Sequence, residues 1–204
     1  MRPLWIIIPA QSFDRSKTRL APLLDQSARR QFSRDCLIHV VRTARMAVLA
    51  TRIVVVSRAA EALGLARRLG VQALRERGRG LNQAVTDASA FAQQRGAAAT
   101  LVLHADLPDI AIRDILALRA KLSQHKGVVL APDSLREGSN ALGLRPPGAI
   151  RYHFGKNSFG KHSSNARGAR RCLLIVDSPG LAGDIDTPEN YLQFLNGKRR
   201  TSSI

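Results

Sequence analysis

The chain has 204 residues, of which 45% are hydrophobic and 23% charged, a balance typical of one globular domain with a single core. Its apolar runs are shorter than the roughly 18 residues that cross a membrane, and Cys36 and Cys172 stand in no zinc or disulfide motif. The 32 Lys and Arg residues outnumber the 15 Asp and Glu residues and give a formal net charge of +17. We expect a cytoplasmic protein without a membrane partner.

Apolar runs alternate with amphipathic stretches along the chain, which predicts an α/β fold with a mostly parallel central sheet flanked by helices. Strands are expected at residues 4–9, 52–57, 71–75, 99–104 and 127–132, with further strands near 140–145 and 172–177. The first helix is indicated by apolar residues that recur at three- and four-residue spacing between Phe32 and Val48. Further helices are expected near 59–69, 81–95 and 111–124.

The regular alternation stops at residues 133–170, where glycines and prolines are frequent. Loops carried by a rigid scaffold are where binding sites are usually built, so we expect this segment to form a substrate pocket. The boundaries predicted for the single domain are 1–197, followed by a basic tail at 198–204.

Two carboxylate clusters follow predicted strands. Asp106 comes directly after one apolar run, and Asp184 and Asp186 lie near the C-terminus. Carboxylates are the ligands that Mg²⁺ prefers, and they leave coordination positions open for phosphates. The set therefore predicts a magnesium site, although each Asp alone is equally consistent with a turn or a helix cap.

The loop after the first strand carries Lys17 and Arg19. In a parallel sheet this loop lies at the carboxyl edge, where ligands bind. A Lys and an Arg placed there can neutralise charge that develops during transfer at phosphorus, so we expect both to bind nucleotide and to act in catalysis with Asp106. Taken alone, this pair is more often plain surface charge, and no Walker A loop accompanies it.

A glycine-bearing loop opens the helix that begins near residue 81. Gly80, Leu81 and Asn82 form this loop, whose backbone amides and side-chain amide suit a nucleobase or ribose. An ordinary N-terminal helix cap explains the same residues. We keep nucleotide binding as the hypothesis for these three positions.

A third group lies within 133–170. Ser139, Gly155 and Ser158 offer hydroxyls and glycine amides that suit a small phosphorylated acid. Ser158 and His162 would share one helix face, which allows a Ser-His hydrolase in principle, but the Gly-x-Ser-x-Gly motif of such enzymes is missing. An anion receptor is the better interpretation.

With these residues in view, the chain resembles the guanylyltransferases of deazaflavin coenzyme biosynthesis, which join GMP to 2-phospho-L-lactate, phosphoenolpyruvate or 3-phospho-D-glycerate. The matching motifs keep the family's order over nearly the whole chain and lie at residues 17–22, 80–82, 105–108, 131–133, 138–142, 154–159 and 179–188. Gln11, His104 and Ser139 depart from it, since relatives more often have Lys, a small or apolar residue, and Thr there.

The resemblance implies a Rossmann-like nucleotidyltransferase fold and a Mg²⁺-dependent transfer of GMP from GTP with release of pyrophosphate. It also implies that Asp106, Asp184 and Asp186 hold the metal. Ser139, Gly155 and Ser158 would then contact the phosphorylated acid, and the guanylylated product would pass to the next enzyme of the pathway.

Two other functions stay open on the residues alone. One is a nucleotidyltransferase for a sugar phosphate or molybdopterin. The other is a basic nucleic-acid-binding protein, which the net charge favours but which the 4% aromatic content and the lack of a recognition module argue against. We therefore expect no specific nucleic-acid partner.

Overall fold

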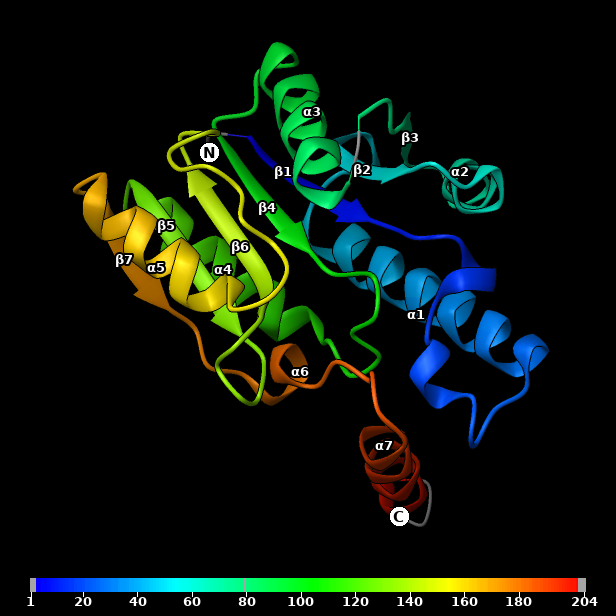
Figure 1. Cartoon of the computed structure of the whole chain (residues 1–204). Helices are drawn as coiled ribbons and strands as arrows, with labels where there is room; N and C mark the ends of the chain where they lie inside the picture. The colour runs from blue at the N-terminus through cyan, green and yellow to red at the C-terminus, as the bar shows by residue number, and fades with distance from the viewer. Residues whose placement is uncertain (1–2, 79, 202–204) are drawn as a thin grey trace.

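The computed structural model describes residues 3–78 and 80–201, and a seven-stranded sheet forms the centre of this part of the chain (Figure 1). The strands are β1 (Leu4–Pro9), β2 (Ile53–Ser57), β3 (Gln72–Arg75), β4 (Ala99–Leu103), β5 (Gly127–Pro132), β6 (Ser139–Arg145) and β7 (Cys172–Ile175). They lie in the order β3-β2-β1-β4-β6-β5-β7. Among these strands only β6 runs antiparallel to its neighbours, so the expected mostly parallel sheet is confirmed.

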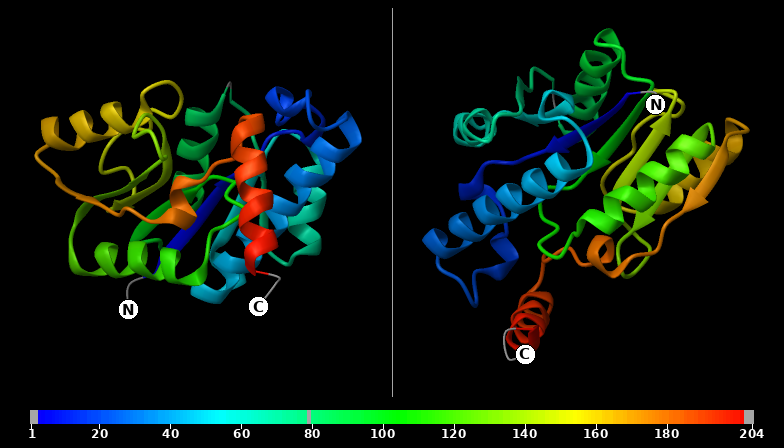
Figure 2. Two further views of the ribbon diagram at one scale, coloured as in Figure 1. Left: turned by 90° about the horizontal axis from the view of Figure 1, so that it is seen from below. Right: turned by 180° about the vertical axis from the view of Figure 1, so that it is seen from behind.

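Helices cover both faces of the sheet (Figure 2). The described helices are α1 (Gln26–Ala47), α2 (Ala60–Arg68), α3 (Leu81–Gln94), α4 (Ile112–Gln124), α5 (Ser158–Gly168), the short α6 (Pro179–Ala182) and α7 (Pro188–Thr201). Three 3-10 turns add η1 (Phe13–Arg15), η2 (Thr18–Leu20) and η3 (Ala50–Arg52). The segment expected to be loop-rich contains β6 and α5. Helix α7 continues into the expected tail, of which residues 202–204 lie outside the described residues.

Strand β1 shows why the sheet has two cores. Its side chains alternate, so that Leu4, Ile6 and Ile8 pack with α1, α2 and α4 on one face. Trp5 and Ile7 pack with α3 and α5 on the other face. A parallel strand that is buried on both faces needs apolar residues at every position, which is the continuous pattern of this segment.

The carboxyl ends of β1, β2, β3 and β4 lie at one edge of the sheet because these strands are parallel. Strand β6 runs the other way, so its first residue, Ser139, reaches the same edge, where it pairs with Pro132 at the end of β5. The backbone N–H of His104 donates to the carbonyl of Asn140 over 3.1 Å. Sheet topology therefore brings residues from distant parts of the sequence to one edge.

A buried carboxylate holds the segment that precedes Asp184. Asp114, at the start of α4, accepts hydrogen bonds from the Ala111 backbone N–H over 2.7 Å and from Ser178 Oγ over 2.5 Å. A Cβ added to Gly180 would lie 2.4 Å from the Asp114 carboxylate, so only glycine allows so close an approach. The turn of α6 is thereby fixed against α4.

Helix α7 is held through aromatic contacts with α1. The ring centroid of Phe32 lies 5.4 Å from that of Tyr191 and 6.0 Å from that of Phe194, both in edge-to-face geometry. This contact places the start of α7, directly after Asp186, beside the loop that follows β1 (Figure 1).

We predict that Gly127→Ala lowers the free energy of unfolding by about 1–3 kcal/mol, the usual cost of overpacking. Gly127 has a φ of +141°, and an added Cβ would lie 2.3 Å from the carbonyl oxygen of Cys172 on β7. The matched control is Gly168→Ala at the end of α5, where an added Cβ meets no heavy atom within 4 Å. Urea unfolding that shows equal stability for the two variants would contradict this account of the β5–β7 pairing.

Candidate nucleotidyl-transfer site

A hollow of about 930 Å³ opens at the carboxyl edge of the sheet. Its walls come from residues 9–13 and 15–19 after β1, residues 56, 58 and 59 at the end of β2, residues 76, 80, 81 and 84 between β3 and α3, residues 104–106 after β4, and residues 33, 37 and 186. The volume lies in the range of small-molecule sites. Lys17, Arg19, Gly80, Leu81, Asp106 and Asp186, all predicted from the sequence, line this hollow.

Lys17 is the centre of the charged part of the hollow. Its Nζ donates to Asp106 Oδ2 and to Asp186 Oδ1, each over 2.7 Å, and its side chain is only 4% exposed. Burial by itself lowers the pKa of Lys17, but the charges of Asp106 and Asp186 outweigh burial and raise that pKa to about 12. We expected an ammonium that binds phosphates, and in the structure it donates to two carboxylates, which use two of its three N–H groups.

The backbone of Lys17 adopts a left-handed conformation, with a φ of 55°. A lysine rarely takes this conformation, which costs of order 1 kcal/mol or more and persists where the surroundings impose it. The residue directly precedes η2, so the turn directs its side chain toward the two carboxylates.

Asp184 lies close to the same charges. Burial, and then the charges of Asp106 and Asp186, raise the pKa of the Asp184 carboxyl. Asn140 Nδ2 donates to the Leu181 carbonyl over 2.9 Å and reaches Asp184 Oδ1 at 3.5 Å, the limit of a hydrogen bond. The three carboxylates predicted to hold a metal are therefore electrostatically coupled.

The fit of the three carboxylates to Mg²⁺ depends on their arrangement and on their donor atoms. No group of three or more His, Cys, Asp or Glu side chains in residues 3–78 and 80–201 is already arranged around a metal position. Asp106, Asp184 and Asp186 nevertheless offer the hard oxygen donors that Mg²⁺ prefers, and a cation, the Lys17 ammonium, already bridges two of them. The donor chemistry fits this metal, and the magnesium site stays a prediction.

Asn82 is placed differently from the sequence expectation. Its Nδ2 donates to the Phe154 carbonyl over 3.1 Å, and its Oδ1 accepts from the Phe154 backbone N–H over 2.7 Å. Both ends of the side-chain amide are therefore bonded to the loop before α5, and Asn82 is not among the residues that line the hollow. The expected contact between Asn82 and a nucleobase has no support in this arrangement.

The predicted acceptor residues gather around a buried histidine. Ser139 Oγ lies 2.9 Å from His162 Nδ1, and His162 Nε2 accepts from the His153 backbone N–H over 2.9 Å. Since Nε2 is an acceptor, Nδ1 carries the proton and donates to Ser139. Ser158 is the first residue of α5 and lies one turn before His162 on that helix. The backbone N–H of Ser158 donates to the Gly155 carbonyl. Topology thus brings Ser139, Gly155 and Ser158 together.

Aromatic rings connect this acceptor group to the hollow. The Phe154 ring centroid lies 5.3 Å from that of His104 and 5.0 Å from that of His162. His104 lines the hollow two residues before Asp106. Its Nε2 is buried and has no hydrogen-bond partner among the described residues, so this atom offers one unused hydrogen bond at the junction.

Two residues of the hollow were missed by the sequence reasoning. Arg58 follows β2 and Glu76 follows β3, and they form an ion pair in which Arg58 Nε donates to Glu76 Oε1 over 2.9 Å. The rule that identified Asp106, a charged residue directly after a parallel strand, would have found both.

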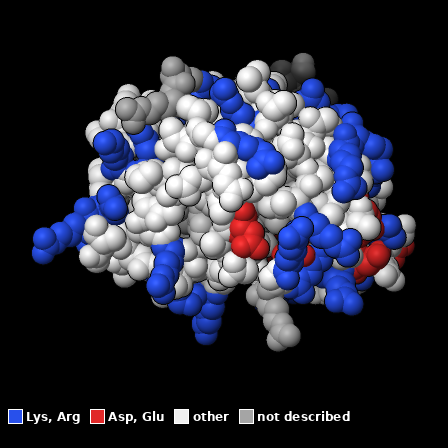
Figure 3. All heavy atoms as spheres, turned by 90° about the horizontal axis from the view of Figure 1, so that it is seen from above, with Lys and Arg blue, Asp and Glu red and all other residues white. Residues whose placement is uncertain are grey.

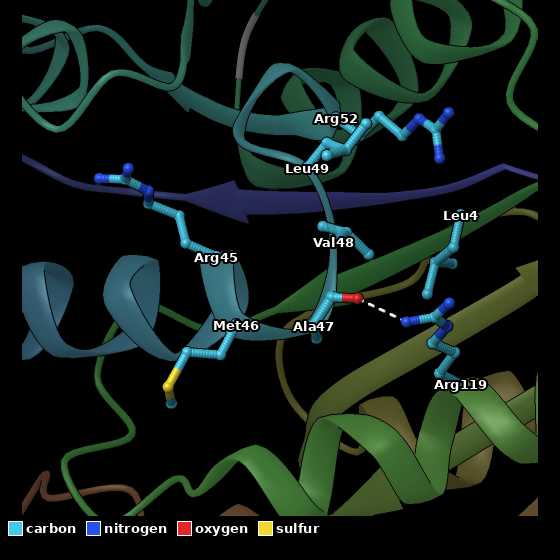
Figure 4. A pocket seen from close by; sticks show the side chains of 8 residues that line it. All are labelled: Leu4, Arg45, Met46, Ala47, Val48, Leu49, Arg52 and Arg119. Atoms are coloured by element: carbon cyan, nitrogen blue, oxygen red, sulfur yellow. Dashed lines mark hydrogen bonds between the residues drawn. The ribbon is translucent and has the colours of Figure 1, made fainter.

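A second, smaller hollow of about 350 Å³ lies near the amino end of β1 (Figure 4). Two of its arginines are hydrogen-bonded at helix ends. Arg119 Nη1 donates to the carbonyl of Ala47, the last residue of α1, and Arg45 Nη1 donates to that of Leu69 after α2. Cations at helix carboxyl ends stabilise the helix, so packing accounts for these two residues.

Lys and Arg side chains are spread over the face shown in Figure 3, where acidic side chains are few. This distribution accompanies the net charge of +17 without gathering on one helix or stripe of that face. Among the helices that the structure describes, none combines the length and apolar composition that a membrane span requires.

Solved structures of nucleotidyltransferases share this fold. A nucleotidyl transferase from Methanothermobacter superimposes with a TM-score of 0.68 at 14% identity, covering 97% of this chain and 98% of that one. A CMP:2-keto-3-deoxy-manno-octonic acid synthetase complexed with CTP superimposes with a TM-score of 0.63 at 14% identity, over 98% and 99% of the two chains. The fold is therefore that of nucleotidyltransferases.

A family model described as guanylyl transferase CofC like matches residues 4–203. The chain therefore belongs to this guanylyltransferase family, as its motifs predict. A phosphoenolpyruvate guanylyltransferase from Rubrobacter xylanophilus is 39% identical over 193 residues, covering 94% of this chain and 93% of that protein. A 2-phospho-L-lactate guanylyltransferase from Methanocaldococcus vulcanius is 31% identical over 199 residues, covering 95% and 85%.

We predict that His162 makes the stability of the protein depend on pH. Burial lowers the pKa of His162 from 6.5 to about 4 in the folded chain. Because the folded pKa is the lower one, the stability contributed by neutral His162 is present above pH 6.5 and is lost as the pH falls toward 4. Between pH 7 and pH 5 the loss should be roughly 2 kcal/mol.

Urea unfolding at pH 7 and pH 5 tests this prediction. It is measured for the wild type, for His162→Gln and for His125→Gln, a control at an exposed site. His162→Gln should flatten the pH dependence by that amount, and His125→Gln should leave it unchanged. Identical pH dependence in all three proteins would rule out His162 as the source.

Proposed function

We propose that the protein transfers GMP from GTP to the phosphate of a three-carbon phosphorylated acid, with release of pyrophosphate, as a Mg²⁺-dependent step of deazaflavin coenzyme biosynthesis. The observation that carries this proposal is the bridge of Lys17 to Asp106 and Asp186 inside the hollow. Membership of the guanylyltransferase family and the names of the relatives supply the reaction class.

In the proposed reaction an acceptor phosphate oxygen forms a bond to the α-phosphorus of GTP. The bond from that phosphorus to the oxygen bridging to the β-phosphorus breaks, and pyrophosphate leaves with the electron pair. The attacking phosphate oxygen is already anionic, so no general base is required. Catalysis then depends on alignment and on neutralising charge, as in phosphoryl transfer generally.

The carboxylates assigned to Mg²⁺ are Asp106, Asp184 and Asp186. When bound, the metal supplies positive charge to the phosphate oxygens. Lys17 and Arg19 lie in the same hollow and can donate to the departing pyrophosphate. The high pKa of Lys17 keeps its ammonium charged for this role at neutral pH.

The acceptor is assigned to the group formed by Ser139, Gly155 and Ser158. Ser158 begins helix α5, where backbone N–H groups and the helix dipole favour an anion. Asn157, just before it, is left-handed with a φ of 54°. The Ser158 and Phe159 amides already donate to the Gly155 and Glu137 carbonyls, so the Ser158 hydroxyl is the group assigned to the acceptor phosphate. The unused Nε2 of His104 lies between this group and the hollow.

Pyrophosphate release tests the proposal directly. We expect release from GTP in the presence of Mg²⁺ and phosphoenolpyruvate, the acceptor named for the 39% identical relative. 2-Phospho-L-lactate and 3-phospho-D-glycerate are the comparison acceptors. A lack of acceptor-dependent release with all three acids would overturn the proposed function.

We predict that Asp106→Asn and Asp186→Asn each lower kcat by at least about tenfold, which corresponds to about 1.4 kcal/mol of barrier. Each substitution removes one charge from the pair that holds Lys17. Asp35→Asn on the exposed face of α1 is the charge-matched control and should keep full activity. Near-normal Mg²⁺-dependent activity in a folded Asp106 or Asp186 variant would remove that carboxylate from the site.

We predict that Ser158→Ala raises the KM for the phosphorylated acid more than the KM for GTP. A hydrogen bond from the hydroxyl to a charged phosphate contributes roughly 1.5–3 kcal/mol when fully formed. Kinetics with each substrate varied separately measure the two effects, and Ser123→Ala on the exposed face of α4 is the control. A defect confined to GTP would place Ser158 on the nucleotide side instead.

A further inference from the structure

Glu76 is the acidic residue of the hollow that the proposed chemistry leaves unused. The acidic residues that line the described hollow are Glu76, Asp106 and Asp186, and the last two share Lys17. Glu76 follows β3, whereas Asp106 follows β4, and the sheet order β3-β2-β1-β4 separates these strands by three steps. At the usual strand spacing, β3 and β4 are about 14 Å apart. Glu76 therefore lies far from the end of the hollow that holds Lys17, Asp106 and Asp186.

The Glu76 carboxylate is held in a fixed orientation by one of its two oxygens. Oε1 accepts from Arg58 Nε over 2.9 Å and from the Gly80 backbone N–H over 3.2 Å. The side chain is 13% exposed. Oε2 has no hydrogen bond within the described residues. One carboxylate oxygen therefore stays able to accept hydrogen bonds from a ligand in the hollow.

Apolar side chains line the same part of the hollow. Val56 comes from the end of β2, and Leu81 and Ala84 come from the first turn of α3. A planar ring between these side chains would be in apolar contact and would turn one polar edge toward Glu76. This combination of apolar walls and one oriented acceptor is the usual make-up of a specific small-molecule site.

We propose that Glu76 determines nucleotide specificity by accepting hydrogen bonds from the N1–H and the 2-amino group of guanine. This inference rests on the proposed function. Guanine carries these two donors side by side, whereas adenine has an acceptor at N1 and no donor at C2. A carboxylate accepts only, so it stabilises the two donors of the guanine edge, whereas at the adenine edge it faces the N1 acceptor and finds no donor. Glu76 replaces Asn82, whose amide is bonded to Phe154, as the residue that selects the base.

Glu76→Gln tests this assignment because glutamine keeps the size of the side chain and replaces one acceptor oxygen by a donor. Xanthosine triphosphate carries a carbonyl oxygen where GTP carries the 2-amino group, so a carboxylate repels it and a glutamine amide can donate to it. We expect the ratio of kcat/KM for GTP over xanthosine triphosphate to fall by at least about tenfold in Glu76→Gln. Asp87→Asn on α3 removes one charge outside the hollow and should keep the wild-type ratio.

Wild-type kinetics with inosine triphosphate, which lacks only the 2-amino group, supply a second measurement that needs no variant. We expect kcat/KM for inosine triphosphate to be at least about fivefold below that for GTP, a usual effect of leaving a buried polar group unpaired. An unchanged GTP preference in folded Glu76→Gln, or equal use of GTP and inosine triphosphate by the wild type, would overturn the role of Glu76. Absence of pyrophosphate release with every nucleotide and acceptor would instead overturn the proposed function.

Discussion

The site depends on one interaction, the bridge that Lys17 makes between Asp106 and Asp186. It joins three parts of the chain, the loop after β1, the end of β4 and the segment before α7. Two carboxylates so close would repel each other. A buried ammonium between them removes the conflict, and the left-handed backbone of Lys17 shows that the fold accepts local strain to place it there.

The reversal of β6 is the second constraint. Parallel strands bring the loops after β1, β2, β3 and β4 to one edge of the sheet. The first residues of these strands lie at the opposite edge. Because β6 runs antiparallel, Ser139 and Asn140 reach that edge, where Asn140 contacts the Asp184 segment. The hollow and the group formed by Ser139, Gly155 and Ser158 are adjacent because of this one change of strand direction.

Much of the fold could be predicted from the sequence, because strands buried on both faces give continuous apolar runs and α1 has a clear periodic stripe. The direction of β6 could not, since its apolar residues suit either direction. The same limit applies to the site. The rule that ligand-binding residues follow parallel strands identifies Lys17 and Asp106 as site residues. It does not predict their ion pair, because the pair depends on the three-dimensional path of the loop after β1. Asn82 was predicted to bind a base because its side-chain amide suits hydrogen bonding to a nucleobase, and only the tertiary structure shows that this amide is bonded to Phe154.

Through the aromatic contact of α7 with Phe32, the charged site depends on a helix that the core does not use. Every strand of the described sheet precedes Asp186 in the chain, and neither core includes a described residue of α7, so the sheet and both cores can form without this helix. Lys17 would then have Asp106 as a partner without Asp186. Docking of Tyr191 and Phe194 on Phe32 brings the second carboxylate into place. Completion of the charged site is in this sense separable from formation of the core, because the site needs α7 in place and the core does not.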